Sequence, residues 1–404
     1  EEGALSAVLH MQRLAALHVW IFSGVEPEAV AEDAEGMVAA LLGLLSTGTR
    51  ALGGFLKADG EPQEVPIKLL CKGTRGEAVW TGSDQPWVEG CSGGSVASLH
   101  EMTAAAFAQF ALRLDLEEVR QHFGKVLEWA RHKQLTALAK QCTGKADEAD
   151  AFKDGESASR MLAFFAVSRG LEREAPGIGL QLLLPLTIAD MASCLTASRH
   201  CALKLGARLR PAARKKRKAS GGVAVRSDIA VLHENTWWWF EVSMATLSFA
   251  GEALKSARTS TQASKPTEEA VDALTEPCAD QLDIFKFLPA EKDSSITRQL
   301  SEALCGAAVS LAAASDSSRV KKVLTSILAK SRSDDVEIRL AAVRCCHRVW
   351  SELGVQVVSG LSEVVMYASE LLEDEDSSVE EAVRAMIKTI EDCTGESLQD
   401  ALKH

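Results

Sequence analysis

The chain has 404 residues, of which 47% are apolar and 25% are charged. This composition is typical of a protein with a packed core, and it argues against a chain that is disordered as a whole. With 44 Lys or Arg against 56 Asp or Glu, the net charge is −12, which excludes a protein that coats nucleic acid through bulk positive charge. Any contact with nucleic acid must therefore be local.

The cysteines and the hydropathy of the sequence indicate the compartment and the type of protein. The ten cysteines lack the spacing of a disulfide framework, which indicates reduced thiols in an intracellular protein. Neither a secretory signal nor a run of 18 uninterrupted apolar residues is present, so we expect no membrane contact. The chain begins at Glu1 without a methionine, which suggests a piece of something longer. A single tyrosine and few alternating β-branched residues favour helices over a β-sandwich.

Residues 1–56 have a helical pattern and are interpreted as the continuation of a longer solenoid. Residues 57–94 are rich in glycine and proline and predict a long loop or insertion. In this loop, Gly90-Cys-Ser-Gly-Gly94 matches the G-x-S-x-G nucleophile elbow of α/β-hydrolases, with Ser92 as the nucleophile. That chemistry needs a strand before the serine and a parallel sheet, and the sequence predicts neither. A serine hydrolase that uses Ser92 therefore stays an alternative that the predicted secondary structure does not support.

Residues 95–206 are interpreted as a helical domain. Its last helix is predicted from Ile178 to Leu209, with a bend at Pro185. Residues 228–292 are interpreted as connecting helices, in which Trp237-Trp-Trp239 open an apolar helix that runs towards Leu254. Because neighbouring helical residues diverge by about 100°, at least one of these tryptophans must lie outside the main core face.

Residues 207–227 are strongly basic. Between Asp190 and Asp228 there is no acidic residue, and ten Lys or Arg occur there. A flexible loop is predicted, because Ser220-Gly-Gly222 follows and no apolar partners accompany the cations. Five consecutive cations form the candidate nucleic-acid-binding or nuclear-localisation site: Arg214, Lys215, Lys216, Arg217 and Lys218. Binding there would neutralise phosphates without reading sequence, and the alternative is a solvated tether.

Residues 293–404 repeat themselves. Asp293, Asp335 and Asp376 each precede an apolar helical stripe, at spacings of 335 − 293 = 42 and 376 − 335 = 41 residues. Each aspartate is expected to cap its helix, and the second and third helices are expected to end at Gly354 and Gly395 in the left-handed conformation. The last two stripes match at a shift of 41: Ile338, Ala341, Ala342, Cys345, Cys346 and Val349 correspond to Val379, Ala382, Val383, Met386, Ile387 and Ile390.

A two-helix unit with a period near 41 residues is typical of HEAT and armadillo repeats. The predicted fold is therefore an all-α solenoid of HEAT-type helix pairs with long irregular insertions; the alternative is a helical bundle with an accidental repeat. Cys345-Cys346-His347 could suggest a metal site. Both cysteines occupy core positions and the C-x-x-C spacing of zinc sites is absent, so core packing is favoured and no metal is expected.

Three stretches carry a family resemblance. Leu371-Leu-Glu-Asp-Glu-Asp376 with Thr394-Gly-Glu-Ser-Leu398 resembles the extreme C-terminus of the very large HEAT-repeat protein of the U3 small nucleolar ribonucleoprotein. Val119-Arg-Gln-His-Phe123, followed by Leu127, Trp129 and Ala130, is similar to an Arg-x-x-Phe…Leu-x-Trp-Ala segment of that family's C-terminal domain. Phe249 to Pro277 is similar to the helical connection between that domain and the last repeats. The glycine-rich insert, the basic run and the three tryptophans depart from the family pattern.

The resemblance implies a non-enzymatic scaffold of the nucleolar small-subunit processome, without catalytic residues, cofactor, metal or small-molecule substrate. Its partners would be other processome proteins, U3 small nucleolar RNA and pre-ribosomal RNA. Its role would be to support pre-18S ribosomal RNA processing and ribosomal RNA transcription in the nucleus and nucleolus. The alternative is a HEAT-repeat adaptor of the transport or phosphatase type.

Overall fold

The computed structural model describes residues 33–53, 96–131, 155–174, 184–219, 242–255, 265–288 and 295–398. Within these ranges the chain forms helices joined by turns and contains no strand, which confirms the predicted all-α class. The chain divides into two compact units, Glu1–Leu183 and Leu184–His404. The boundary falls inside the predicted domain 95–206, and each unit is described by itself.

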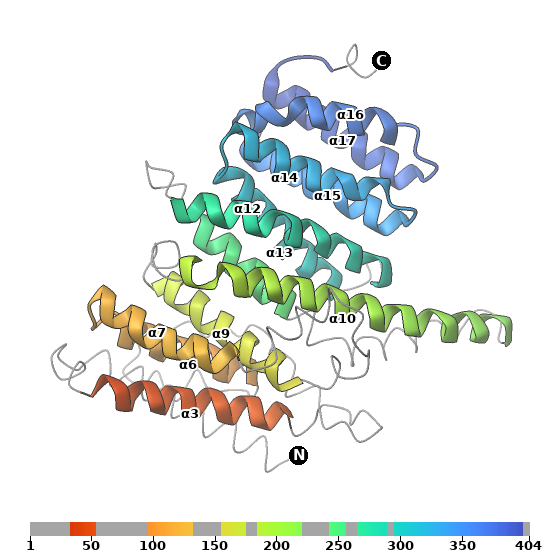
Figure 1. Cartoon of the computed structure of the whole chain (residues 1–404). Helices are drawn as coiled ribbons and strands as arrows, with labels where there is room; N and C mark the ends of the chain where they lie inside the picture. Colours follow the sequence, from red (N-terminus) through yellow and green to blue (C-terminus); the bar gives the residue numbers. More distant parts are fainter. Residues whose placement is uncertain are drawn as a thin grey trace, which may run out of the picture. The chain divides into compact units, whose positions relative to one another are not determined.

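The first unit contains four described helices, α3 (Ala34–Gly53), α6 (Val96–Ala111), α7 (Leu116–Arg131) and α9 (Gly155–Glu174). α6 packs against α3 and α9, and α7 packs against α9 and α3 (Figure 1). Their shared core is aromatic, with Phe123 and Phe164 at a ring-centroid distance of 5.2 Å. Burying such large rings is the main favourable term for a small helical unit.

A reciprocal cap begins α7. The Asp115 carboxylate accepts hydrogen bonds from the Glu117 and Glu118 backbone N–H groups at 2.9 and 2.8 Å. In return, the Glu118 carboxylate accepts from the Asp115 N–H at 3.0 Å. This capping box satisfies N–H groups that a helix start leaves without partners, and it fixes where α7 begins.

The second unit is built largely of helix pairs. Its first helices are α10 (Leu184–Ala219) and a helix over 242–255. They are followed by α12 (Lys265–Asp280) with η3 (Gln281–Phe287), α13 (Ser295–Ala313), α14 (Ser317–Ala329) with η5 (Lys330–Arg332), α15 (Val336–Leu353) with η6 (Gly354–Gly360), α16 (Leu361–Leu371) and α17 (Ser377–Thr394).

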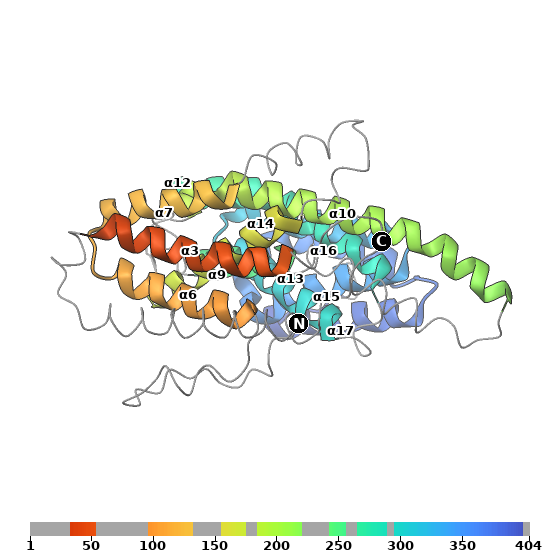
Figure 2. The ribbon, with the colours of Figure 1, turned by 90° about the horizontal axis from the view of Figure 1, so that it is seen from below.

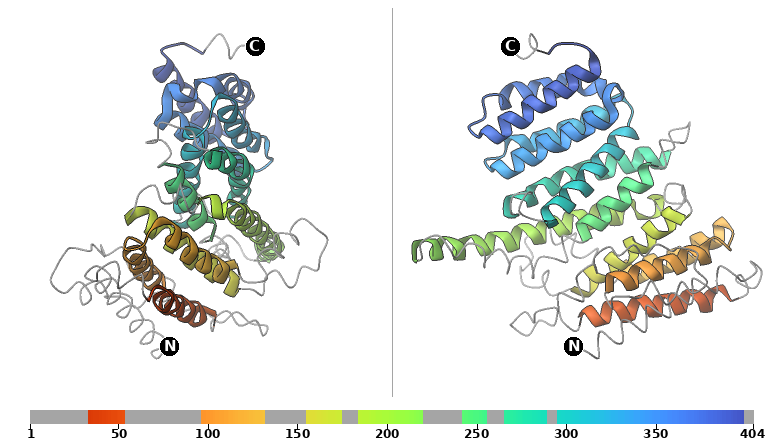
Figure 3. Two further views of the ribbon diagram at one scale, coloured as in Figure 1. Left: turned by 60° about the vertical axis from the view of Figure 1, so that its left-hand side comes forward. Right: turned by 180° about the vertical axis from the view of Figure 1, so that it is seen from behind.

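Two layers of helices run through this unit. α12, α14 and α16 lie side by side in one layer, and α13, α15 and α17 lie side by side in the other (Figure 3). Each helix of the first layer also packs on the following helix of the second. α15 is therefore covered by α13 on one side and by α17 on the other, whereas α17 packs on α15, η6 and α16.

The predicted bend in the long helix is wrong. α10 begins at Leu184, so that Pro185 is its second residue. In the first turn of a helix, the backbone N–H that proline lacks would have no intrahelical partner anyway, and the fixed φ of proline suits the helix. Pro185 therefore starts α10 and does not bend it.

The predicted helix ends are confirmed in part. The Asp376 carboxylate accepts from the Ser378 N–H at 2.9 Å, and Gly395 is left-handed with φ 71° and ψ 9°. Asp335 stands at the start of α15 but makes no side-chain cap bond, so the prediction is wrong there. Where α17 offers the Ser378 hydroxyl as an additional donor, α15 carries the like-charged Glu337. Gly354 has a positive φ of 51° with ψ −124°, outside the left-handed helical region, and Asp293 lies outside the described residues.

Burial of the two matched stripes follows the prediction at most positions. Ile338, Ala342, Cys345, Cys346 and Val349 are buried, as are Val379, Val383, Met386 and Ile390. Ala341, Ala382 and Ile387 are only half-buried. The expectation that Ile387 lies in the core like Cys346 is therefore wrong, because α15 has neighbours on both sides in its layer.

We expect Gly395→Ala to lower the free energy of unfolding by about 1 kcal/mol, since an alanine strains at positive φ. A Cβ there would meet no atom within 4 Å, so the loss measures backbone strain alone. Gly306, inside α13, also has open space for a Cβ, and Gly306→Ala should instead stabilise by about 0.5–1 kcal/mol. Urea denaturation of both variants checks the opposite signs; a loss at Gly306 as large as at Gly395 would contradict the prediction.

Candidate interaction surface

The predicted nucleic-acid-binding or nuclear-localisation site lies at the C-terminal end of α10. The helix carries all five cations, Arg214, Lys215, Lys216, Arg217 and Lys218, whose side chains lie outside the described residues. Figures 1 and 2 show that this end of α10 extends beyond the neighbouring helices of its unit. The five positions are thus held together on one projecting helix.

The prediction of a flexible loop from residue 207 is wrong as far as Ala219, because this segment is helical. Alanine, leucine, arginine and lysine, which dominate the end of α10, are strong helix formers. Cations in the last turns also interact favourably with the negative end of the helix dipole. Pro211 removes one backbone hydrogen bond, which the helix tolerates. Residues 220–227 lie outside the described residues.

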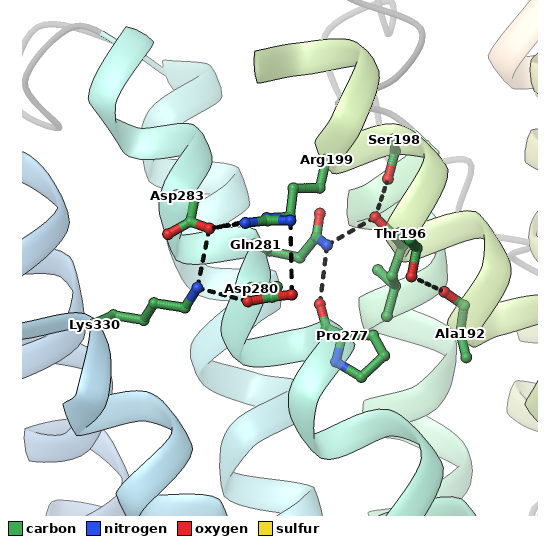
Figure 4. Close-up of polar contacts among 10 residues, drawn as sticks. Ala192, Thr196, Ser198, Arg199, Pro277, Asp280, Gln281, Asp283 and Lys330 are labelled. Atoms are coloured by element: carbon green, nitrogen blue, oxygen red, sulfur yellow. Dashed lines mark hydrogen bonds and ion pairs between the residues drawn. The ribbon is translucent and has the colours of Figure 1, made fainter. Parts of the chain in front are cut away.

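A four-residue ionic cluster holds the N-terminal half of α10 in place (Figure 4). Arg199 of α10 donates from Nε to Asp283 Oδ2 of η3 at 2.9 Å. Lys330 at the end of α14 donates to the same oxygen at 3.0 Å and to Asp280 Oδ1 at 2.6 Å. Two cations and two carboxylates balance, so the cluster fixes α10 against η3 and η5 without a net charge. The four side chains are half-buried.

Beneath this cluster runs a buried polar contact. Gln281 is fully buried, and its Nε2 donates to the Leu195 and Pro277 carbonyl oxygens, both at 2.9 Å. Its Oε1 lies 3.0 Å from the Ser243 hydroxyl, which lies 2.7 Å from that of Ser198. Buried polar groups are costly unless they are hydrogen-bonded, so this contact specifies one arrangement of α10, the helix 242–255 and α12. Figure 4 shows Gln281 reaching both α10 and the carbonyl of Pro277.

Sequence reasoning missed both contacts, although each determines how α10 is mounted. Arg199 is 84 residues from Asp283, and Lys330 is 47 residues from it. No local spacing encodes such pairs. Pro277 in the last turn of α12 is no such signal, because the N–H that proline lacks would bond the carbonyl oxygen four residues before it and none of the residues of either contact.

Ion pairs join α12 to α14 within the layer formed by α12, α14 and α16. Arg319 donates to Asp272 at 3.1 Å and to Asp316 at 2.7 Å, and it lies 3.4 Å from Glu268. The Asp272 carboxylate is the main cause that raises the pKa of Arg319 above its ordinary value. Asp316 also caps α14, since it accepts from the Ser318 and Arg319 N–H groups at 2.9 Å.

Similar pairs join α14 and η5 to α16. Arg332 of η5 donates to Glu370 at 2.7 Å and stacks 4.6 Å from the ring centroid of Tyr367. Lys321 lies 3.7 Å from Glu363. The hydrogen bond from Arg332 holds the pKa of Glu370 below its ordinary value. These exposed pairs contribute little individually because water and salt screen them, but they give the layer of α12, α14 and α16 a mixed, partly neutralised charge.

A more buried pair connects α15 to the turn before α17. Arg339 donates to Asp374 through Nε and Nη2, both at 2.8 Å, and its Nη1 donates to the Ser333 carbonyl oxygen at 3.0 Å. The side chains are only 13% and 7% exposed. Hydrogen bonds from Arg339 are the main cause that lowers the pKa of Asp374. This fork fixes the acidic turn that carries the family resemblance.

The second stretch that carries the resemblance lies in α7 of the first unit. Val119 and Phe123 are buried, and His122 is 5% exposed, edge-on to Phe110 at 5.8 Å, with its pKa lowered mainly by burial. Trp129 donates from its indole N–H to the Ser46 hydroxyl at 2.9 Å. These residues build a core and offer no catalytic arrangement of their own.

The remaining candidate sites are resolved by burial or lie outside the described residues. Cys345 and Cys346 are buried at 1% and 0% exposure, and His347 Nε2 lies 2.8 Å from the Thr389 hydroxyl. Burial raises the pKa of the Cys346 thiol to about 12, which makes it a poor metal ligand. No group of potential metal ligands occurs among the described residues. Ser92 and Trp237–Trp239 lie outside them, and every helix within them is too short or too polar to cross a membrane.

Comparison with known proteins gives one consistent result. The chain is similar to U3 small nucleolar RNA-associated protein 10 of Coccidioides immitis, at 39% identity over 103 residues. The proteins of that name from Aspergillus niger and Chaetomium globosum match at 34% over 131 residues and at 40% over 103 residues. These matches cover 23%, 30% and 25% of this chain.

The same matches cover 6%, 7% and 6% of the relatives, so the chain spans only a small part of their length. No protein-family model matches the chain. No solved structure matches it.

Proposed function

We propose that this chain, which carries a region belonging to the U3 small nucleolar RNA-associated protein 10 family, is a non-enzymatic scaffold segment in small ribosomal subunit biogenesis. It acts in the nucleolus as part of the small-subunit processome, where it supports pre-18S ribosomal RNA processing and ribosomal RNA transcription. Its partners are other processome proteins, U3 small nucleolar RNA and pre-ribosomal RNA. The observation that carries the proposal is the set of matches to relatives of one name.

We also propose that the second unit includes a HEAT-type solenoid with a period of about 41 residues. The bounds of the last helix pairs support it, since α15 and α17 begin at 336 and 377 and end at 353 and 394, giving 377 − 336 = 41 and 394 − 353 = 41. The two layers of side-by-side helices also suit stacked pairs. Such an array exposes a long surface for partners.

The basic end of α10 is the proposed RNA contact of this scaffold. Five consecutive cations, Arg214 to Lys218, are carried by one helix end. Neutralising phosphates with such a run of cations gives affinity without sequence preference. The ionic cluster at Arg199 holds the base of the same helix, so the projecting end is supported by a rigid mount.

We expect replacement of all five cations, Arg214 to Lys218, by glutamine to flatten the salt dependence of RNA binding. Each lost phosphate contact lowers the slope of log K against log salt by about 0.7 for single strands. Glutamine is a good helix former, so the melting temperature should not change. Fluorescence anisotropy with single-stranded pre-ribosomal RNA at several salt concentrations measures the slope.

A control matched in charge uses pairs of lysines. Lys215→Gln with Lys216→Gln should lower the slope, whereas Lys322→Gln with Lys388→Gln, two described helix positions away from α10, should leave it unchanged. Equal effects of the two pairs would show that only net charge matters, and an unaltered slope in the five-residue variant would remove the α10 end as an RNA contact.

The scaffold role itself is tested in cells with the full-length protein tagged at its C-terminus. Enrichment of U3 small nucleolar RNA and 5′ pre-ribosomal RNA, together with a nucleolar signal, is the expected result. A cytoplasmic or diffuse nuclear signal without those RNAs would leave the helical fold intact and assign the chain to a general HEAT-repeat adaptor, with transport or phosphatase partners as the proteins to seek.

A further inference from the structure

A groove of about 240 Å³ lies in the second unit between the helix 242–255, α13 and the last turn of α15. Its floor consists of small residues from two facing helices, among them Gly251 and Gly306. Its rim carries Glu252 and Lys255 from the first helix, Glu302 from α13 and Glu352 from α15. The basic run lies elsewhere, at the C-terminal end of α10.

Gly306 is exposed on the floor of this groove although it sits inside α13. A glycine in a helix interior costs about 0.5–1 kcal/mol relative to alanine. An added Cβ at Gly306 would meet no atom within 4 Å, so packing within the described residues does not require the glycine. A glycine without a packing reason leaves the helix backbone open to close approach from outside.

One turn further along α13, the hydroxyl of Ser310 points to the same conclusion. Ser310 lines the groove at 7% exposure, and among the described residues its side chain has no hydrogen-bond partner. Other buried hydroxyls, such as those of Ser168 and Thr275, donate to the carbonyl oxygen four residues before them at 2.9 and 2.6 Å. The Ser310 hydroxyl makes no such bond and is open to the groove, where it can donate a hydrogen bond to a ligand or accept one from it.

The charge of the rim indicates what kind of ligand fits. With Arg348, the ion-pair partner of Glu352, three glutamates and two cations give 2 − 3 = −1. Glu302 is exposed and makes no ion pair within the described residues, and Glu352 pairs with Arg348 one turn before it on the open surface. An exposed pair of this kind exchanges readily for another cation. The rim repels nucleic acid and attracts a cationic side chain.

We propose that this groove binds a lysine- or arginine-bearing segment of a partner protein, with small residues where the segment crosses Gly306. Its cationic side chains pair with Glu302 and Glu352, and the Ser310 hydroxyl hydrogen-bonds its backbone. The site goes beyond the scaffold role proposed above and uses none of the residues of the basic run. Loss of RNA binding at α10 and loss of peptide binding here are separate results.

The test uses the full chain and a short fluorescent peptide of repeated lysine, glycine and serine. Gly306→Leu fills the floor and should lower the affinity at least about tenfold, equivalent to about 1.4 kcal/mol. Because leucine is a better helix former than glycine, this variant should melt no lower than the parent. Glu302→Lys should lower the affinity about fivefold and weaken its salt dependence.

The matched control is Gly124→Leu, since Gly124 also lies inside a helix with no atom within 4 Å of an added Cβ. It should leave peptide affinity within about twofold. Carbodiimide coupling, which joins a lysine amine to a carboxylate with loss of water, should place the peptide on Glu252, Glu302 or Glu352 by mass spectrometry. The proposal is overturned if Gly306→Leu binds like the parent, if the adducts scatter over other carboxylates, or if single-stranded RNA competes for the groove.

Discussion

Met386→Asp should unfold the α16–α17 end of the second unit. Met386 is fully buried on the face of α17 that packs on α15. An aspartate there places a charge without a partner in an apolar core, at a cost of several kcal/mol. Since a whole domain is stable by only about 5–15 kcal/mol, this change removes a large share. Thermal melting followed by circular dichroism, with hydrogen exchange across α16 and α17, measures it.

The neighbouring position supplies the control. Ile387 is half-buried, whereas Met386 is fully buried. Ile387→Asp can keep its carboxylate in water, so we expect a loss of only about 1–2 kcal/mol. Equal losses at Met386 and Ile387 would mean that α17 is rotated about its axis relative to the structure described here.

Asp374→Ala is the second large effect that we expect, at about 3–5 kcal/mol. The change leaves the Arg339 guanidinium, 13% exposed, without the carboxylate that accepts two of its hydrogen bonds. Removing one partner of a buried pair costs far more than the pair contributes, because the remaining charge is desolvated and uncompensated. Glu370→Ala is the control, since its partner Arg332 is half-exposed and the expected loss is far smaller than that of Asp374→Ala. Urea denaturation of both variants measures the two losses. Equal losses would mean that the Arg339–Asp374 pair contributes no more than an exposed surface pair.

The same pair gives a dependence on pH with a defined sign. Arg339 holds the pKa of Asp374 in the folded protein below its ordinary value, which is about 3.9 in an unfolded chain. The stabilisation is therefore complete at about pH 5 and above, and it is lost as the pH falls through the unfolded value towards the lower, folded value. Stability measured from about pH 5 down to 2 should fall less steeply in Asp374→Ala than in the parent. Parallel curves would contradict the role given to this carboxylate.

The sequence predicts much of the fold of the last two helix pairs and little of what surrounds them. Asp376, Gly395 and the buried stripe from Val379 to Ile390 follow from helical period and end signals, which are local. The same reasoning fails at Ile387, because burial there depends on which helices flank α17. It fails again at residues 207–219, where the following Ser220-Gly-Gly222 and the lack of apolar partners predict a loop although arginine and lysine favour a helix.

The candidate sites show the same division. The run from Arg214 to Lys218 is visible in the sequence because its members are adjacent, and its helical setting is not. The groove at Gly306 cannot be predicted from the sequence, since Glu302 and Glu352 lie 50 residues apart. A single glycine in a helical pattern does not by itself indicate a binding site. Residues far apart in the sequence can be assigned to one site only when the packing of the helices is known. A glycine or hydroxyl that this packing does not explain then indicates a site.

The two layers of the second unit are held by forces of different range, and this gives it an asymmetric bending stiffness. α12, α14 and α16 are joined in part by exposed ion pairs such as those of Arg319 and Arg332, which give way gradually and soften with salt. α13, α15 and α17 are joined by buried apolar side chains, which resist separation over a short distance. Under load, α12, α14 and α16 should separate from one another before α13, α15 and α17 do, so that the unit bends with the apolar layer as its hinge. Raising the ionic strength should make this bending easier.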